Sequence, residues 1–135
     1  MPNVSINWLA VLVAAVINMV VGAAWYSPSV FGKTWSKLVG RKMEDMRSNA
    51  GPGYAITTVA ALVQAYILSL FVGYAGVDTV ARGALVGFML WLGFAAATSI
   101  SDTVFAGRPW KLWQINTGYY LVVLVVNGAL LAVWR

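Results

Sequence analysis

Hydrophobic positions along this chain gather in four long stretches that contain no charged residue: residues 1–32, 48–77, 83–101 and 112–134. A helix needs roughly 20 mostly apolar residues to cross the hydrocarbon core of a bilayer. We therefore predict four membrane-spanning helices, at about residues 6–26, 54–74, 80–101 and 114–134. So little chain remains between them that residues 1–135 are expected to form a single membrane domain, an all-α bundle of four transmembrane helices.

The first stretch is expected to stay in the protein as a helix. Cleaved signal peptides begin with basic residues, whereas the first basic residue here, Lys33, follows the stretch. The prolines agree with the predicted spans. All four fall outside them, where a missing backbone N–H costs no hydrogen bond: Pro2, Pro28, Pro52 and Pro109.

Basic residues are concentrated on one side of the predicted bundle. Of the nine Lys and Arg, five follow the first span and two follow the third, against Arg82 and Arg135 on the other side. Because basic connections stay cytoplasmic, both termini are expected outside, in the cytoplasmic (inner) membrane of a bacterium. The net charge of +5 then reflects topology and contact with membrane lipid, and we expect no nucleic-acid partner.

The connection after the first span has an amphipathic pattern. Its basic residues recur every four positions at Lys33, Lys37 and Arg41, while Phe31 and Trp35 fall on the opposite side of a helical wheel. This pattern predicts a short helix over about residues 29–43, lying on the cytoplasmic leaflet. We favour a lipid-surface anchor over the alternative, a regulatory or partner-binding element.

The connections after the first and third spans resemble each other. Residues 27–38 are SPSVFGKTWSKL and residues 101–112 are SDTVFAGRPWKL, so that Val-Phe, Gly, a basic residue, Trp, Lys and Leu match in order with one gap in each. The following spans both open with Gly-Tyr, at Gly53 and Gly118. This indicates two helical hairpins of common origin, repeated in parallel about an axis along the membrane normal. Chance similarity in a biased composition is the alternative.

Small residues recur every four positions in the first two spans, a spacing that lets membrane helices pack closely. They predict helix-packing seams, although the sequence leaves open whether these join helices of one chain or of several. The seam residues are Ala10, Ala14 and Gly22 in the first span, and Ala61, Ala65, Ser69 and Gly73 in the second.

Uncharged polar residues inside the spans are the candidates for a functional site: Asn18, Gln64, Asn116 and Asn127. An amide in hydrocarbon needs hydrogen-bond partners, so these side chains are expected to point into the bundle or into a subunit interface. Bonds between helices are the commoner role, and the alternative is a polar cavity for a small substrate or ion. Trp91, near the middle of the third span, is expected to provide packing rather than binding.

Oxygen-bearing side chains crowd the end of the third span, with Ser99, Ser101 and Asp102 at their centre. Hard cations prefer oxygen ligands, so a weak cation site is one interpretation. We favour the other, in which Asp102 caps the next turn or pairs with Arg108 and the hydroxyls bond back to helix carbonyls.

The chemistry that an enzyme needs is sparse in this chain. It contains no Cys and no His, which removes thiolate sites, imidazole bases and the usual ligands of zinc, copper and haem. No phosphate-binding glycine loop or nucleophile elbow is present. We therefore expect no catalytic residues, no cofactor and no metal site, and predict that the protein is not an enzyme.

Several runs resemble one family. They are Asn7-Trp8-Leu9-Ala10 with Asn18, Gly22-x-x-Trp25-Tyr26-Ser27-Pro28 followed by Phe31-Gly32-Lys33-x-Trp35, and Gly107-Arg108-Pro109-Trp110-Lys111-Leu112 with Gly118-Tyr119. The chain resembles, over essentially its whole length, the bacterial integral-membrane family called domain of unknown function 1761. The resemblance implies a small four-helix membrane protein and assigns no catalytic residue.

Two functions remain open. The one we favour from sequence is an assembly or accessory protein that acts through lateral helix contacts, as a homo-oligomer or within a larger membrane complex. The alternative is a small oligomeric transporter or channel for a small solute or ion. A dry, tightly packed centre would argue against transport, whereas a cavity reaching the amides would favour it.

Overall fold

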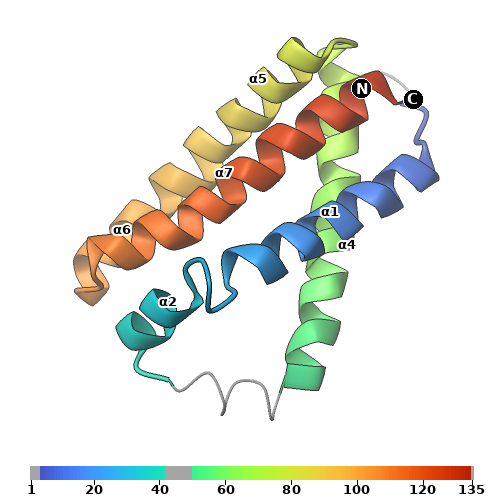
Figure 1. The fold of residues 1–135 in the computed structure, drawn as a ribbon. Helices are drawn as coiled ribbons and strands as arrows, with labels where there is room; N and C mark the ends of the chain where they lie inside the picture. Colours follow the sequence, from blue (N-terminus) through green and yellow to red (C-terminus); the bar gives the residue numbers. More distant parts are fainter. Residues whose placement is uncertain (1–3, 42–49, 135) are drawn as a thin grey trace.

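The computed structural model describes residues 4–41 and 50–134, and the regular structure within these ranges is entirely helical (Figure 1). This confirms the all-α prediction. Two of the long helices, α5 and α6, are joined without a break by a π-helix, η1. The elements are α1 (Trp8–Trp25), α2 (Gly32–Val39), α4 (Ala50–Ala75), α5 (Val80–Leu90), η1 (Trp91–Ala96), α6 (Ala97–Ala106) and α7 (Trp110–Val133).

Four helical segments of 18 to 27 residues are long and apolar enough to cross a membrane: α1, α4, the continuous α5–η1–α6, and α7. At about 1.5 Å per residue, even the shortest is about 27 Å long, close to the thickness of a bilayer's hydrocarbon core. Four spans were predicted, and the structure confirms that number.

The observed helices extend several residues beyond the approximate bounds predicted for the third and fourth spans. The third span continues past Ser101 to Ala106, where Gly107 ends it with a left-handed backbone of φ 67°. The fourth span begins at Trp110, directly after Pro109, instead of at residue 114. Polar residues at an exposed helix end do not stop a helix, whereas a left-handed glycine followed by proline does.

Pro52 also lies inside a helix, α4, although it was predicted to lie between spans. It occupies the first turn of the described helix, where backbone N–H groups have no partner within the helix. A proline there costs no hydrogen bond, which is why the span extends through it.

The spans form two antiparallel pairs, α1 with α4 and α5–α6 with α7, and α7 contacts every other span. Helices α5 and α7 pack most closely, α1 pairs with α4, and α7 also contacts α1 and α4. The close approach of α5 to α7 depends on glycines, because a Cβ at Gly83 or Gly87 would collide with the backbone carbonyl of Gly128 or Leu124. Helix α4 instead crosses α1 and α7 steeply (Figure 1).

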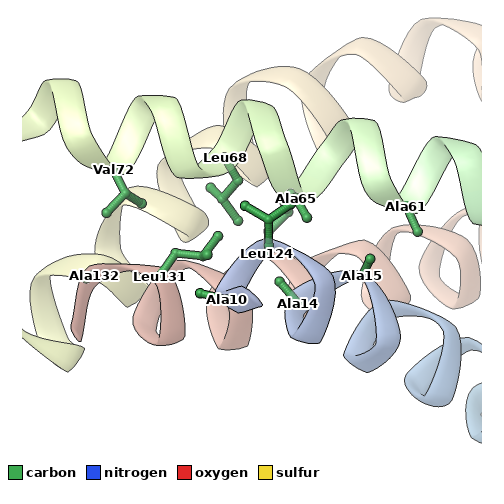
Figure 2. Packing of buried hydrophobic residues seen from close by; sticks show 11 residues of the cluster. Ala10, Ala14, Ala15, Ala61, Ala65, Leu68, Val72, Leu124, Leu131 and Ala132 are labelled. Atoms are coloured by element: carbon green, nitrogen blue, oxygen red, sulfur yellow. The ribbon is translucent and has the colours of Figure 1, made fainter. Parts of the chain in front are cut away.

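The predicted packing seams meet inside this one chain. Ala10 and Ala14 of α1 are fully buried, and Ala61 and Ala65 of α4 are 2% exposed in the same cluster. Figure 2 shows these alanines between α1 and α4, with Leu124 and Leu131 of α7 beside them. The three other seam residues, Gly22, Ser69 and Gly73, are partly buried.

The amphipathic helix exists but is shorter than predicted. Helix α2 ends at Val39, because Gly40 adopts a left-handed conformation with φ 78°. Arg41 therefore follows the helix, and residues 42–43 of the predicted range lie outside the described residues. The aromatic side of α2 and its N-cap packs on the end of α1, through ring contacts of Phe31 with Trp25 and of Trp35 with Tyr26. Lys33 and Lys37 are exposed.

The two segments that echo each other in sequence have different local structures. Residues 27–31 form turns before α2, whereas residues 101–106 continue α6 as helix. Both nevertheless connect helices that pair with each other, α1 with α4 and α5–α6 with α7. The common origin of the two hairpins stays a prediction.

We call the end of the bundle that carries α2 and the α6–α7 turn the basic end. Its described basic residues are Lys33, Lys37, Arg41, Arg108 and Lys111. The opposite end carries the beginning of α1, the α4–α5 turn and the end of α7 (Figure 1).

Candidate functional site

Asn18 forms a polar junction between three spans. Its side-chain amide donates to Gln64 Oε1 on α4 at 2.8 Å, and the Tyr119 hydroxyl on α7 donates to the Asn18 backbone carbonyl at 3.0 Å. The same hydroxyl contacts Asn18 Oδ1. Asn18 is buried, so these bonds supply the partners that an amide needs in an apolar surrounding.

Asn127 is the most deeply buried of the predicted amides, at 1% exposure. Its Nδ2 donates to the Ala14 carbonyl at 3.0 Å and so ties α7 to α1. Its Oδ1 has no hydrogen-bond partner among the described residues. This side chain lies in the packed part of the bundle and joins helices there.

Asn116 lies nearer the basic end and has a different partner. The Tyr26 hydroxyl, just past the end of α1, donates to Asn116 Oδ1 at 2.8 Å. The Tyr26 ring also packs against Trp35 of α2 and Tyr119 of α7, each with ring centroids 5.6 Å apart. Tyr26 therefore holds α1, α2 and α7 together around Asn116.

An open cavity of about 640 Å³ occupies the half of the bundle near the basic end. It lies where α4 and α6 both contact α7 less closely than α5 does. We call it the basic-end cavity. Its polar and aromatic lining residues are Tyr26, Trp35, Gln64, Phe94, Ser99, Asp102, Thr103, Arg108, Trp113, Asn116, Thr117 and Tyr120.

The four predicted amides therefore divide into two pairs. Gln64 and Asn116 line the basic-end cavity, while Asn18 and Asn127 do not. Asn18 still supports the cavity wall, because its side-chain amide donates a hydrogen bond to the lining residue Gln64. The cavity volume lies within the roughly 300–1,000 Å³ typical of small-molecule sites.

The oxygen-rich cluster takes a form close to the interpretation that we favoured. Ser99 Oγ donates to the Ala95 carbonyl at 2.6 Å and accepts from Trp113 Nε1 at 2.8 Å. Asp102 Oδ2 lies 3.4 Å from Arg108 Nε, and both side chains are largely exposed.

The predictions made for Asp102 as a cap, for Ser101 and for a cation site in this cluster have different outcomes. Asp102 does not cap the next helix, because the N-cap of α7 is Pro109 and makes no side-chain bond. Ser101 is exposed and is not among the cavity residues, unlike Ser99 and Asp102. Within the described ranges, no three His, Cys, Asp or Glu residues come together as a metal site would need.

The π-helix η1 forms the cavity wall opposite α4, through Phe94 and Ala95. At its start, the Trp91 indole N–H donates to the Thr117 carbonyl on α7 at 2.7 Å, so this mid-span tryptophan is held by the bundle. The Thr98 hydroxyl donates back to the Phe94 carbonyl at 2.6 Å. Short π-helices interrupt α-helices frequently at functional sites.

Sequence reasoning missed η1 and the aromatic residues of the cavity wall, among them Tyr26, Trp35 and Trp113. Their positions near predicted span ends favoured the ordinary role of membrane-interface aromatics. No motif in residues 91–96, WLGFAA, indicated a π-helix.

The opposite half of the bundle is closed. A hollow of about 150 Å³ at the opposite end is lined in part by the seam residues Ser69 and Gly73, and it shares no lining residue with the basic-end cavity. Leu68 and Ala65, both 2% exposed, fill the space between the two. Within the described residues, packed side chains therefore separate the basic-end cavity from the hollow at the opposite end.

The groups that line this site are mostly uncharged hydrogen-bonding and aromatic side chains. The site offers neutral donors and acceptors, the aromatic side chains of Tyr26, Trp35, Trp113 and Tyr120, and a single ion pair. Such groups orient a small ligand through hydrogen bonds and stacking.

Comparison with known proteins supports the expected membership. No curated protein and no solved structure matches the chain. A family model described as "Protein of unknown function (DUF1761)" matches residues 9–132, which is nearly the whole chain and includes every helix that contributes to the cavity. The chain belongs to this family.

Proposed function

We propose that this protein is an integral membrane carrier that binds a small solute in the basic-end cavity. The observation that carries the proposal is a cavity that reaches two intramembrane amides, Gln64 and Asn116, at one end of a bundle whose other end is packed. A site open on one side and closed on the other is what one state of an alternating-access carrier requires. A permanent channel would need a continuous path.

The charge distribution supports an orientation for this carrier. Basic connections stay cytoplasmic, so the basic-end cavity would open inward and both termini would lie outside. Helix α6 is the element best suited to move, because α5 is locked to α7 by Gly83 and Gly87 while α6 contacts α7 much less.

Native mass spectrometry of protein released gently from its own membranes tests this function. We expect the wild-type chain to retain a small molecule of defined mass. Asn116→Phe and Ala95→Phe place a ring in the cavity and should lose it, while Val59→Phe, on an exposed part of α4, should keep it. Absence of any small molecule, or equal retention by the two cavity variants, would contradict the proposal.

An accessory role is the second candidate, and one observation favours it. Every residue from Gly51 to Ala60 is exposed, so this apolar part of α4 packs against nothing in the described chain. A second copy or another membrane subunit could cover it. The small-residue seam no longer supports such a partner, because Ala61 and Ala65 are buried against α1. The same mass spectra distinguish this role, since a reproducible additional subunit would replace the small molecule.

A further inference from the structure

An apolar groove of about 380 Å³ lies between α4 and the α5–η1 segment. Apart from Gln64, all of its lining residues are apolar, and they include Ile67 and Phe71 on α4 and Leu90 on α5. Ile67 is 41% exposed and Phe71 46%, so the groove opens on the outer surface of the bundle. In a bilayer that surface faces lipid.

The groove and the basic-end cavity adjoin each other. Four residues line both of them: Gln64, Phe94, Ala95 and Leu124. Gln64 stands at the border, with its Oε1 held by Asn18, so polarity changes there from hydrogen-bonding groups to hydrocarbon. The combined space is therefore amphipathic, with the polar basic-end cavity at one end and the apolar groove at the other.

The shape of the apolar groove fits one hydrocarbon chain. It follows α4 from Gln64 to Phe71, about 10 Å along the helix axis at about 1.5 Å per residue. Its walls are two helical segments, α4 on one side and α5–η1 on the other, with Leu124 of α7 between them. A linear chain lying along this groove buries apolar surface on both sides.

The charged residues of the basic-end cavity favour a ligand whose polar head group carries no net charge. Among the described residues, Asp102 and Arg108 are the only charged lining residues of the basic-end cavity, and their charges cancel. Their side chains pair at 3.4 Å yet remain largely exposed, so each retains donors or acceptors for a ligand. A head carrying one anionic and one cationic group complements an Arg beside an Asp, and Asn116 adds a neutral hydrogen-bonding group.

We propose that the ligand is a single-chain zwitterionic amphiphile, whose head occupies the basic-end cavity and whose chain lies in the apolar groove. The inference rests on the proposed binding function and names its ligand class. Access is lateral, from the lipid between α4 and η1, through the side where Phe94 is 75% exposed. A water-soluble solute would have no use for the groove.

Photocrosslinking in lipid nanodiscs tests this proposal. The probe is a dodecyl lysophosphatidylethanolamine with a diazirine at the end of its chain, and the labelled residues are mapped by peptide mass spectrometry. We expect labelling of the groove at Ile67, Phe71 or Leu90, with competition by unlabelled lysophosphatidylethanolamine. The same chain on an anionic phosphoglycerol head should label the groove more weakly, because the basic-end cavity offers no net positive charge.

Two variants separate groove binding from general contact with lipid. Ile67→Trp fills the groove and should abolish groove labelling. Val63→Trp, one turn away on α4 and also exposed, lies outside the groove and should leave labelling unchanged. Even labelling of all outward residues, such as Val59 and Phe105, would overturn the proposal, as would groove labelling that Ile67→Trp does not reduce.

Failure of this inference can be told from failure of the proposed function. A retained molecule without a hydrocarbon chain, lost in Asn116→Phe, would preserve the binding function and overturn the amphiphile. A crosslinked dimer with an unlabelled groove would assign the groove to a second copy and also overturn it. Absence of both a retained molecule and groove labelling would overturn the function as well.

Discussion

The Asn18 side-chain amide donates to Gln64 Oε1 at 2.8 Å, and this bond joins α1 to α4 at the inner wall of the basic-end cavity. On one side of it the spans pack closely through Ala14, Ala65 and Leu68. On the other side the basic-end cavity leaves polar groups open, and α4 is exposed from residue 60 back to residue 51. The bond therefore marks the boundary between the closed and open halves of the bundle.

We expect Asn18→Ala to lower the free energy of unfolding by about 0.6–2 kcal/mol, the usual range for a hydrogen bond between membrane helices. The loss leaves Gln64 Oε1 without this donor and removes the contact of the Tyr119 hydroxyl with Asn18 Oδ1, while the backbone carbonyl of residue 18 still accepts from Tyr119. Denaturant titration in lipid–detergent micelles measures the change. Thr58→Val is the control, because the Thr58 hydroxyl bonds only to the carbonyl of Tyr54 in its own helix.

A double-mutant cycle with Gln64→Ala isolates the bond itself. The coupling between positions 18 and 64 should be favourable and about 0.6–1.7 kcal/mol. Strictly additive effects would show that the two amides do not stabilise each other.

The charge-free stretches predicted the four spans because a membrane helix must satisfy its backbone internally and exclude charge over its whole length. Helix ends follow local turn chemistry instead. The third span passes the polar Ser101 and Asp102 and stops at Gly107, which the hydrophobic pattern did not indicate. A Gly-x-Pro sequence does carry that signal, at Gly107 and Pro109.

The candidate site was harder to predict, because the four amides look alike in sequence. Asn127 and Asn116 both lie on α7, yet one is sealed in the core and the other lines a cavity. The difference comes from the steep crossing of α4 and the loose packing of α6, which are properties of the assembled bundle. No spacing within a single span encodes them.

Gly87→Ala is expected to destabilise the bundle strongly, because its Cβ would collide with the Leu124 carbonyl and the adjacent backbone of α7. Steric overpacking of this kind costs about 1–3 kcal/mol or more. Gly53→Ala is the matched control, since nothing lies within 4 Å of a Cβ there. The control should be neutral or stabilising, as glycine-to-alanine changes usually are in an open helix. Equal effects of the two changes would contradict glycine-mediated contact between α5 and α7.

Single cysteines can test the orientation cleanly, because the native chain has none. Lys33→Cys on α2 and Asp78→Cys in the α4–α5 turn lie at exposed positions on opposite ends of the bundle. In intact cells an impermeant maleimide should label Asp78→Cys only, and Lys33→Cys should react after the membrane is opened. The reverse pattern would place the basic end outside, and labelling of both would indicate mixed topology.

Water access to the two asparagines of α7 should differ sharply. Asn116→Cys lines the open cavity, so a water-soluble methanethiosulfonate reagent added from the basic end should modify it. Asn127→Cys replaces a side chain that is 1% exposed and should stay unmodified until the protein unfolds. Reactivity needs the thiolate, which forms only where water or a polar surrounding stabilises the charge. Fast modification at both positions would mean that water passes through the packed half of the bundle. That result would contradict a cavity closed toward the opposite end and would indicate a continuous pathway.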